Sequence, residues 1–144
     1  MIVCDSGPLI SACNRAEGRR HEFAAGLLAS LGRRVLVPWS TYVEVHLVLR
    51  ARGHIGSALI FGRALLGGTH RLDHPTDAEH DHALDLVERY AETGLDLVDA
   101  SVMAIAAARS GLILTWDFRH FRAAVPARGR HWPLLVQEHE VPER

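Results

Sequence analysis

Three short, uninterrupted apolar runs constrain the fold of this 144-residue chain more than any other feature. They comprise residues 2–4, 35–37 and 112–114, the last of which Thr115 continues, and segments with helical periodicity lie between them. A run that is apolar at every position is typical of a strand buried on both faces of a parallel sheet. Because the strands alternate with helices, βαβ crossovers are expected. The sequence therefore predicts an α/β fold with a mainly parallel sheet between two layers of helices.

Capping and turn residues mark the ends of the other elements. Thr41–Glu44 and Thr76–Glu79 have the form of capping boxes, and Gly111 stands where a glycine commonly ends a helix. Two weaker strands are expected at Arg71–Leu72 and Leu134–Val136. Helices are expected over residues 6–14, 22–31, 41–49, 57–66 and 76–94, and from Asp96 or Asp99 to Gly111.

Length and composition predict one compact domain over residues 1–144, in which residues 138–144 form a polar C-terminal tail. No apolar run approaches the roughly 18–20 residues that cross a membrane, and no basic region precedes the first apolar stretch. The two cysteines, Cys4 and Cys13, are too few for a disulfide framework. These features predict a cytoplasmic protein without a membrane partner.

All 16 basic residues are arginine, and the chain has no lysine. This absence argues against P-loop nucleotide binding, Schiff-base chemistry and receiver-type phosphoacceptor domains, which use a lysine. The planar guanidinium group suits phosphate and carboxylate partners, although pairs of arginines are also common on solvated surfaces.

Four acidic residues are expected to meet at one edge of the sheet. Asp5 and Asp117 follow predicted strands, and Glu44 and Asp99 lie in the first turns of predicted helices. Taken singly, each has an ordinary interpretation as a cap or a turn residue. In folds of this class, however, ligands bind beyond the carboxyl ends of the strands, so the shared position indicates a functional site.

Four ionised carboxylates at short range repel one another unless a cation compensates them. Ligation by oxygen alone favours Mg²⁺ or Mn²⁺, which can activate water for an in-line displacement at phosphorus. No GxSxG or Cys/His pattern indicates a protein nucleophile. The histidines between His70 and His82 fit a polar loop and a solvated helix face better than a zinc site, and His46 is a weak candidate for a catalytic base.

Four segments carry a resemblance to a known family. They read Ile-Val-Cys-Asp-Ser-Gly-Pro-Leu-Ile from residue 2, Val-Glu-Val from residue 43, Leu-Asp-Leu-Val-Asp-Ala-Ser-Val from residue 95, and Leu-Thr-Trp-Asp-Phe-Arg-His-Phe from residue 114. Together they resemble PIN domains, and most closely the VapC-type toxins of bacterial toxin–antitoxin pairs. The resemblance implies a three-layer α/β/α sandwich and an endoribonuclease that depends on Mg²⁺ or Mn²⁺.

By position, the family's catalytic and metal-binding acids correspond to Asp5, Glu44, Asp99 and Asp117. Ser6 and Thr115 correspond to polar neighbours of these acids, and Asp96 is expected to cap a helix or to support the site from nearby. Arg119 and Arg122, with His120 between them, are candidates for contacting RNA phosphates. Trp116 departs from the family pattern, and packing is favoured for it over stacking on a base.

The resemblance also implies partners. Members of the family commonly form homodimers, and a cognate antitoxin occupies their active-site groove. Contact with DNA is expected only through the antitoxin. Two alternatives stay open at this point: a non-catalytic PIN-like module that binds protein, and a metal-dependent DNA nuclease or phosphatase that uses the same acids.

Overall fold

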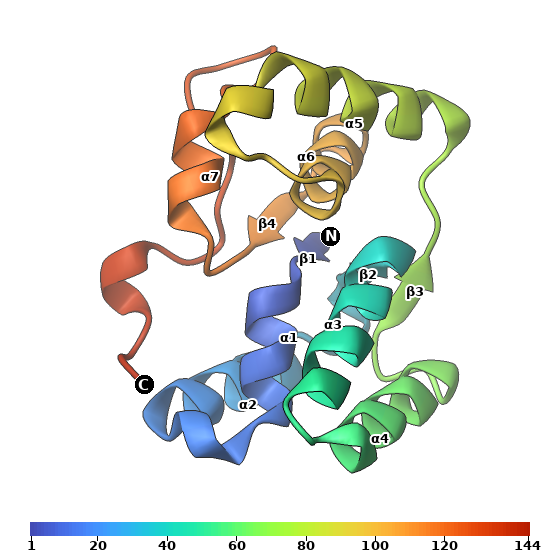
Figure 1. Cartoon of the computed structure of the whole chain (residues 1–144), viewed down its shortest axis with the longest axis vertical. Coiled ribbons are helices and arrows are strands. Elements are labelled where there is room, and N and C mark those ends of the chain that lie inside the picture. The colour runs from blue at the N-terminus through green and yellow to red at the C-terminus, as the bar shows by residue number, and fades with distance from the viewer.

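The computed structural model describes residues 1–144 and contains a four-stranded sheet in which every pair of neighbours is parallel (Figure 1). The strand order is β3-β2-β1-β4, with β1 at Ile2–Cys4, β2 at Val35–Pro38, β3 at Arg71–Asp73 and β4 at Leu112–Leu114. The chain goes from β1 to β2 on one side and reaches β4 on the other. The order therefore reverses between β1 and β4.

Seven α-helices surround this sheet. They are α1 (Ser6–Cys13), α2 (Arg19–Leu31), α3 (Trp39–Ala51), α4 (Ile55–Leu66), α5 (Asp77–Arg89), α6 (Leu97–Arg109) and α7 (Phe118–Ala123). Short 3₁₀ turns occupy Arg15–Glu17, Gly32–Arg34, Ala91–Thr93 and Glu138–Glu140. None of the helices has the length and apolar character that a bilayer crossing requires.

Alternation along the strands divides the core into two layers. Val3, Leu36 and Ile113 point into one hydrophobic cluster, which includes residues of α5, α6 and α7. The neighbouring strand residues Cys4 and Leu114 point into a second cluster, which includes residues of α1 to α4. Figure 1 shows the same division, with α5, α6 and α7 on one side of the sheet and α1 to α4 on the other. The predicted α/β/α sandwich is confirmed.

The capping box predicted at Thr41–Glu44 is wrong. Pro38 ends β2 and is itself the N-cap of α3, so the helix begins at Trp39 and Thr41 lies within its first turn. The Thr41 hydroxyl is buried and has no hydrogen-bond partner. The capping box at Thr76 and Glu79 is present, because there the helix does begin directly after the threonine.

Gly111 does not end α6 as predicted. Ser110 is the C-cap, in the left-handed conformation with φ 52°, and its N–H donates to the carbonyl of Ala106. Gly111 is needed for space instead, because a Cβ at this position would lie 3.3 Å from Val3 Cγ2. Glycine here permits the close approach of the chain to β1.

The expected strand at Leu134–Val136 is reduced to one parallel bridge between Leu134 and Ile113. Ile113 N–H donates to the carbonyl of Pro133, and Leu135 N–H donates to the carbonyl of Ile113. Pro133 has no N–H of its own, so it contributes only an acceptor to this edge of the sheet.

Candidate active site

The four predicted acids line one pocket of about 360 Å³ at the carboxyl edge of the sheet. Asp5 directly follows β1, and Asp117 follows β4 after two residues. Glu44 lies in the second turn of α3, and Asp99 lies in the first turn of α6. The pocket thus lies beside the reversal of strand order between β1 and β4, where α/β sheets bind ligands.

Asp5 is held at the base of the pocket by two hydrogen bonds. The backbone N–H of Ser6 donates to Asp5 Oδ1 at 2.8 Å, and the Thr115 hydroxyl donates to Oδ2 at 2.7 Å. The Thr115 hydroxyl also accepts from the backbone N–H of Asp117 at 2.9 Å. Thr115 therefore connects the acid after β1 to the acid after β4.

Ser6 connects the pocket to α3. Its hydroxyl donates to Glu44 Oε1 at 2.7 Å, while its backbone N–H donates to Asp5 as described above. Ser6 and Thr115 thus occupy the positions beside the acids that the sequence predicts for them. The hydroxyl of each residue donates a hydrogen bond to one carboxylate, that of Glu44 for Ser6 and that of Asp5 for Thr115.

His120 holds the other two acids together. Its Nδ1 lies 2.9 Å from Asp99 Oδ2 and 2.8 Å from Asp117 Oδ2. Both carboxylates therefore approach the same ring nitrogen, which joins the acid of α6 to the acid after β4. Carboxylate and imidazole atoms of these three residues lie within 4.8 Å of one another, close enough to hold one ion.

Asp96 is the N-cap of α6, and its side chain accepts from the backbone N–H of Asp99 at 2.8 Å. Its carboxylate is therefore committed to the first turn of the helix, although the residue also lines the pocket. This cap fixes the backbone that presents Asp99.

Burial and mutual repulsion make the charged form of these acids costly. Burial, followed by the charges of Glu44 and Asp117, raises the pKa of Asp5 to about 6, against the opposing hydrogen bonds from Thr115 and Ser6. Burial, followed by the charges of Asp5, Asp96, Asp117 and Glu44, raises the pKa of Asp99 to about 9. Both carboxyl groups therefore hold a proton more readily than a free aspartate does.

The residues present fit a hard divalent cation. Carboxylate oxygens are the ligands that Mg²⁺ and Mn²⁺ prefer, and a bound cation would offset the burial and the mutual repulsion that raise the pKa of Asp99 and of Asp5. His120 adds one nitrogen, which Mn²⁺ accepts more readily than Mg²⁺ does. The donor set therefore suits the predicted cofactors, and which acids bind an ion stays a prediction.

The arginines that the sequence singled out lie outside this pocket. Arg119 is exposed on α7, and Arg122 pairs with Glu138 at 2.5 Å while its guanidinium lies over the Phe118 ring. Three other arginines line the pocket instead: Arg20, Arg52 and Arg144. They are far apart in the sequence, so no local motif joins them.

Trp116 packs as expected. Its Nε1–H donates to Ser11 Oγ at 2.9 Å, and its ring lies 6.0 Å from that of Phe23. Gly7 makes room for it, because a Cβ there would lie 3.2 Å from the indole. Trp116 is also one of the residues that line the acidic pocket.

The histidines between residues 70 and 82 point to different surroundings. His70 Nδ1 lies 2.8 Å from the carbonyl of Gly32, and His74 stacks on Trp39 with 5.3 Å between ring centroids. His80 and His82 lie on α5. His46 does not line the acidic pocket either.

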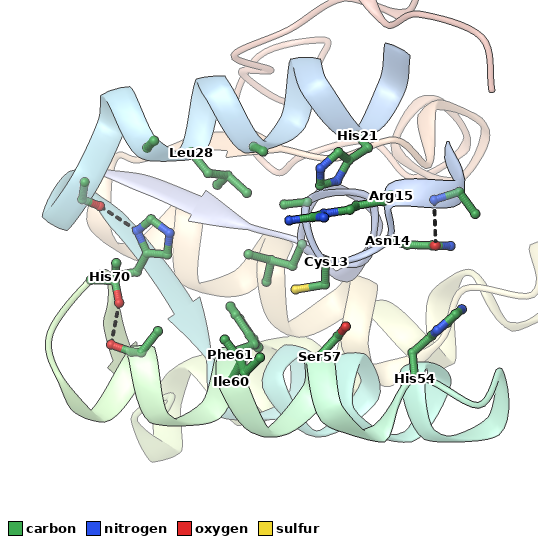
Figure 2. Close-up of a pocket in the computed structure, with 18 residues that line it drawn as sticks. Cys13, Asn14, Arg15, His21, Leu28, His54, Ser57, Ile60, Phe61 and His70 are labelled. Carbon is green, nitrogen blue, oxygen red and sulfur yellow. Dashed lines mark hydrogen bonds between the residues drawn. The ribbon is translucent and has the colours of Figure 1, made fainter. Parts of the chain in front are cut away.

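A second and larger cavity, of about 650 Å³, lies between α1, α2 and α4 (Figure 2). Leu28 of α2 lies on one side of it, and Ile60 and Phe61 of α4 lie on the other. No acidic residue lines this cavity. It therefore lacks the chemistry of the carboxylate pocket.

Comparison with known proteins assigns the family. The model of the PIN domain matches residues 2–126, which is most of the chain. The chain belongs to the PIN domain family. The match extends through α7 and includes all four acids of the pocket.

Individual relatives of this PIN domain are distant. Ribonuclease VapC26 of Mycobacterium tuberculosis is 25% identical over 135 residues, which cover 93% of this chain and 99% of VapC26. The crystal structure of M. tuberculosis VapC20, a toxin that cleaves the sarcin–ricin loop, has a TM-score of 0.71 at 22% identity and covers 83% of this chain and 94% of its own. A toxin–antitoxin complex from Klebsiella pneumoniae has a TM-score of 0.61 at 20% identity, covering 84% and 90%. At these identities the solved structures establish the fold.

Proposed function

We propose that this PIN domain is a metal-dependent endoribonuclease that acts as the toxin of a toxin–antitoxin pair. The observation that carries the proposal is the meeting of Asp5, Glu44, Asp99 and Asp117 in one pocket, from four different elements. The ribonuclease name of VapC26 supports RNA as the substrate. Since cellular RNA is the proposed target, the cytoplasm is the expected place of action.

In this proposal, the four acids hold Mg²⁺ or Mn²⁺ and bring the scissile phosphodiester and a water molecule together. When bound, the ion supplies the positive charge that a displacement at phosphorus requires. Ser6 and Thr115 keep the carboxylates of Glu44 and Asp5 oriented through their hydroxyl hydrogen bonds. His120 keeps those of Asp99 and Asp117 together. Water is the nucleophile, so no side chain needs to form a covalent bond.

The test is cleavage of end-labelled RNA by the purified chain with Mg²⁺, with Mn²⁺ and with EDTA. Asp5→Asn and Asp99→Asn are each expected to lower the rate by at least about 100-fold, as removal of one transition-state charge contact commonly does. Asp85→Asn, at an exposed position on α5, is the matched control and should cleave like the wild type.

The same assay separates the alternatives. Cleavage that continues undiminished in Asp99→Asn would refute the assignment of the acids. Cleavage of single-stranded DNA or hydrolysis of p-nitrophenyl phosphate in preference to RNA would favour the DNA nuclease or phosphatase. A well-folded chain that hydrolyses none of these substrates would be a binding module.

We further propose a cognate antitoxin as a protein partner, with DNA contacted only through it. The toxin–antitoxin complex among the structural relatives supports this, and the 650 Å³ cavity between α1, α2 and α4 offers an apolar segment of a partner a place to bind. Ile60 lines that cavity and is 72% exposed. Ile60→Arg is therefore expected to weaken antitoxin binding, measured by calorimetry, and to leave RNA cleavage intact.

A homodimer is also proposed. Trp39, Val43 and Leu47 are exposed and lie four residues apart on one face of α3. Such a stripe of apolar side chains is typical of a surface that another protein covers. Light scattering should give a mass of two chains for the wild type and of one chain for Leu47→Glu.

A further inference from the structure

An arginine rim borders the acidic pocket and plays no part in the chemistry described so far. It consists of Arg20 on α2, Arg52 at the C-terminal end of α3, and Arg144. All three line the same pocket as the catalytic acids proposed above. They come from three separate parts of the chain, so the fold alone brings them together.

Each rim arginine has N–H groups free to bind an anion. Arg20 uses only its Nε, which donates to the carbonyl of Pro142 at 2.9 Å. Arg144 uses only its Nε, which lies 3.2 Å from Glu17 Oε1, and the guanidinium of Arg52 makes no hydrogen bond or ion pair. Arg109 provides the contrast, because its guanidinium is occupied by Glu79 and Asp73. The rim therefore presents free terminal guanidinium nitrogens, which are the groups through which arginine donates paired hydrogen bonds to phosphate.

The segment 141–144 is fixed where it supplies this rim. Val141 packs against the hydrophobic cluster on the α1–α4 side of the sheet, and the carbonyl of Pro142 accepts from Arg20. Figure 1 shows the segment, in red, lying next to the N-terminal end of α2. The sequence predicts a polar tail here, and the structure places that tail against the pocket.

Glu17 is the residue that holds Arg144. Only 4% of Glu17 is exposed, and its second carboxylate oxygen, Oε2, is buried without a hydrogen-bond partner. A buried carboxylate needs a cation nearby, and Arg144 is the one that the structure provides. Glu17 is also one of the residues that line the pocket, so the ion pair with Arg144 lies at the pocket's boundary.

Charge explains why such a rim is useful. Six carboxylates line the pocket, from Asp5, Glu17, Glu44, Asp96, Asp99 and Asp117, against three guanidinium groups, so its formal balance is −3. A divalent ion held by the acids would add two positive charges, which is fewer than the six carboxylates carry. The phosphates on either side of the one that reacts enter a strongly negative region unless cations on the boundary receive them.

We propose that Arg20, Arg52 and Arg144 bind the phosphates that flank the scissile phosphodiester of a single-stranded polynucleotide, and that Glu17 is a positioning residue for Arg144. The proposal rests on the proposed function for the identity of its substrate. Free guanidinium groups also attract the carboxylates of an acidic peptide. A phosphate backbone is the favoured ligand, because it must pass the rim to reach the acids, whereas a peptide has no such need.

The test is fluorescence anisotropy with a fluorescein-labelled, 20-nucleotide single-stranded RNA of randomised sequence, in EDTA so that the probe stays intact. Each of Arg20→Ala, Arg52→Ala and Arg144→Ala is expected to weaken binding roughly 3–10-fold at low salt. Each should also reduce the slope of log K against log salt concentration by about 0.7, the value for one lost phosphate contact on a single strand. Arg144→Lys should keep most of that slope.

Arg130→Ala is the matched control, since Arg130 is exposed, lines none of the described pockets and loses the same charge. It should bind like the wild type. Glu17→Gln should reproduce the weaker binding of Arg144→Ala, provided its melting temperature shows that it folds. If Glu17→Gln does not fold, the comparison of Arg144→Ala with Arg144→Lys tests whether the charge of Arg144 contributes to RNA binding.

Three results would overturn the proposal. They are a wild type that does not bind the RNA, rim variants with the control's affinity and slope, and rim variants that lose affinity only for a ten-residue polyglutamate peptide.

Cleavage kinetics in Mg²⁺ distinguish a failure of the rim proposal from a failure of the proposed function. The rim variants should raise KM with little change in kcat. If they cleave normally with an unaltered KM, the proposed role of the rim is refuted and the proposed nuclease activity is not. If RNA binding depends on the rim but the chain cleaves no RNA, the proposed nuclease activity is refuted and the role of the rim is not. A fluorescein-labelled DNA of matching length shows whether the rim distinguishes the two backbones.

Discussion

At the scale of single residues, Asp99 and Asp5 make stability depend on pH. The pKa of each is raised in the folded chain, to about 9 and about 6, so the folded state binds protons that the unfolded chain releases. Stability is therefore lost as pH rises from the ordinary aspartate range, near 4, through these folded values. In EDTA, the free energy of unfolding should fall by about 1–3 kcal/mol between pH 5.5 and pH 8.

Urea titrations at the two pH values provide the measurement. The ten histidines of the chain titrate in the same interval, so the informative quantity is the difference between variants. The double variant Asp5→Asn/Asp99→Asn should show a smaller pH dependence, and Asp85→Asn should retain the full one. Equal pH profiles for all three proteins would mean that the buried acids do not carry this effect.

Thr115 gives a second prediction at this scale. Its hydroxyl donates to Asp5 and accepts from the N–H of Asp117, so Thr115→Val leaves two polar groups without their partner. The loss should be about 1–3 kcal/mol in the free energy of unfolding, measured by urea denaturation. Thr115→Ser keeps the hydroxyl and should lose clearly less; a serine variant as unstable as the valine variant would point to packing.

The sequence reveals some residues of the site and hides others for a physical reason. Asp5 and Asp117 can be predicted because Asp5 directly follows an apolar strand and Asp117 follows one after two residues, which fixes the sheet edge that both occupy. The sequence predicts His120 only as a candidate phosphate contact. No local sequence pattern indicates that one turn of α7 brings its ring between Asp99 and Asp117. Its spacing of three residues from Asp117 was the available signal.

At the scale of elements, the two threonine patterns on α3 and α5 separate a real cap from an apparent one. Thr76→Ala removes the hydroxyl that accepts from Glu79 N–H and should cost about 1 kcal/mol of stability. Thr41→Val removes a buried hydroxyl that has no partner, so it should leave stability unchanged or raise it. Thermal or urea unfolding of the two variants measures both effects. A loss in Thr41→Val equal to that in Thr76→Ala would contradict the assignment.

The N-termini of α3 and α5 show that a capping-box pattern alone does not determine where a helix begins. Thr76 caps α5 because the chain before it is irregular, so its side chain is free to turn back to Glu79. Thr41 has the same spacing to Glu44, but Pro38 already starts the helix, and the boundary is therefore set by the end of β2. The pattern alone does not contain that information.

At the scale of the whole molecule, a cation in the acidic pocket should stabilise the folded chain by mass action. For a dissociation constant of about 1 mM, 10 mM Mg²⁺ would add about 1.4 kcal/mol. That would raise the melting temperature by roughly 3–6 °C for a chain of this size. Asp99→Asn should lose most of the increase. An equal increase with KCl of the same ionic strength would assign the effect to screening.

The layers of the molecule could be predicted, but the approach of distant segments could not. Continuous apolar strands between helices are sufficient to indicate a parallel sheet with helices on both faces. The contact of Arg20 with Pro142 joins residues 122 positions apart and depends on packing throughout the domain. No periodicity in the sequence marks such a contact.

The position of β1 has a consequence for synthesis on the ribosome. This strand is made first, yet it lies inside the sheet, and its second neighbour, β4, begins only at residue 112. The bond between Thr115 and Asp5 spans 110 positions, so the carboxylates cannot assemble until nearly the whole PIN domain has left the exit tunnel. A nascent or prematurely terminated chain therefore carries Asp5 and Glu44 without the pocket in which they meet Asp117.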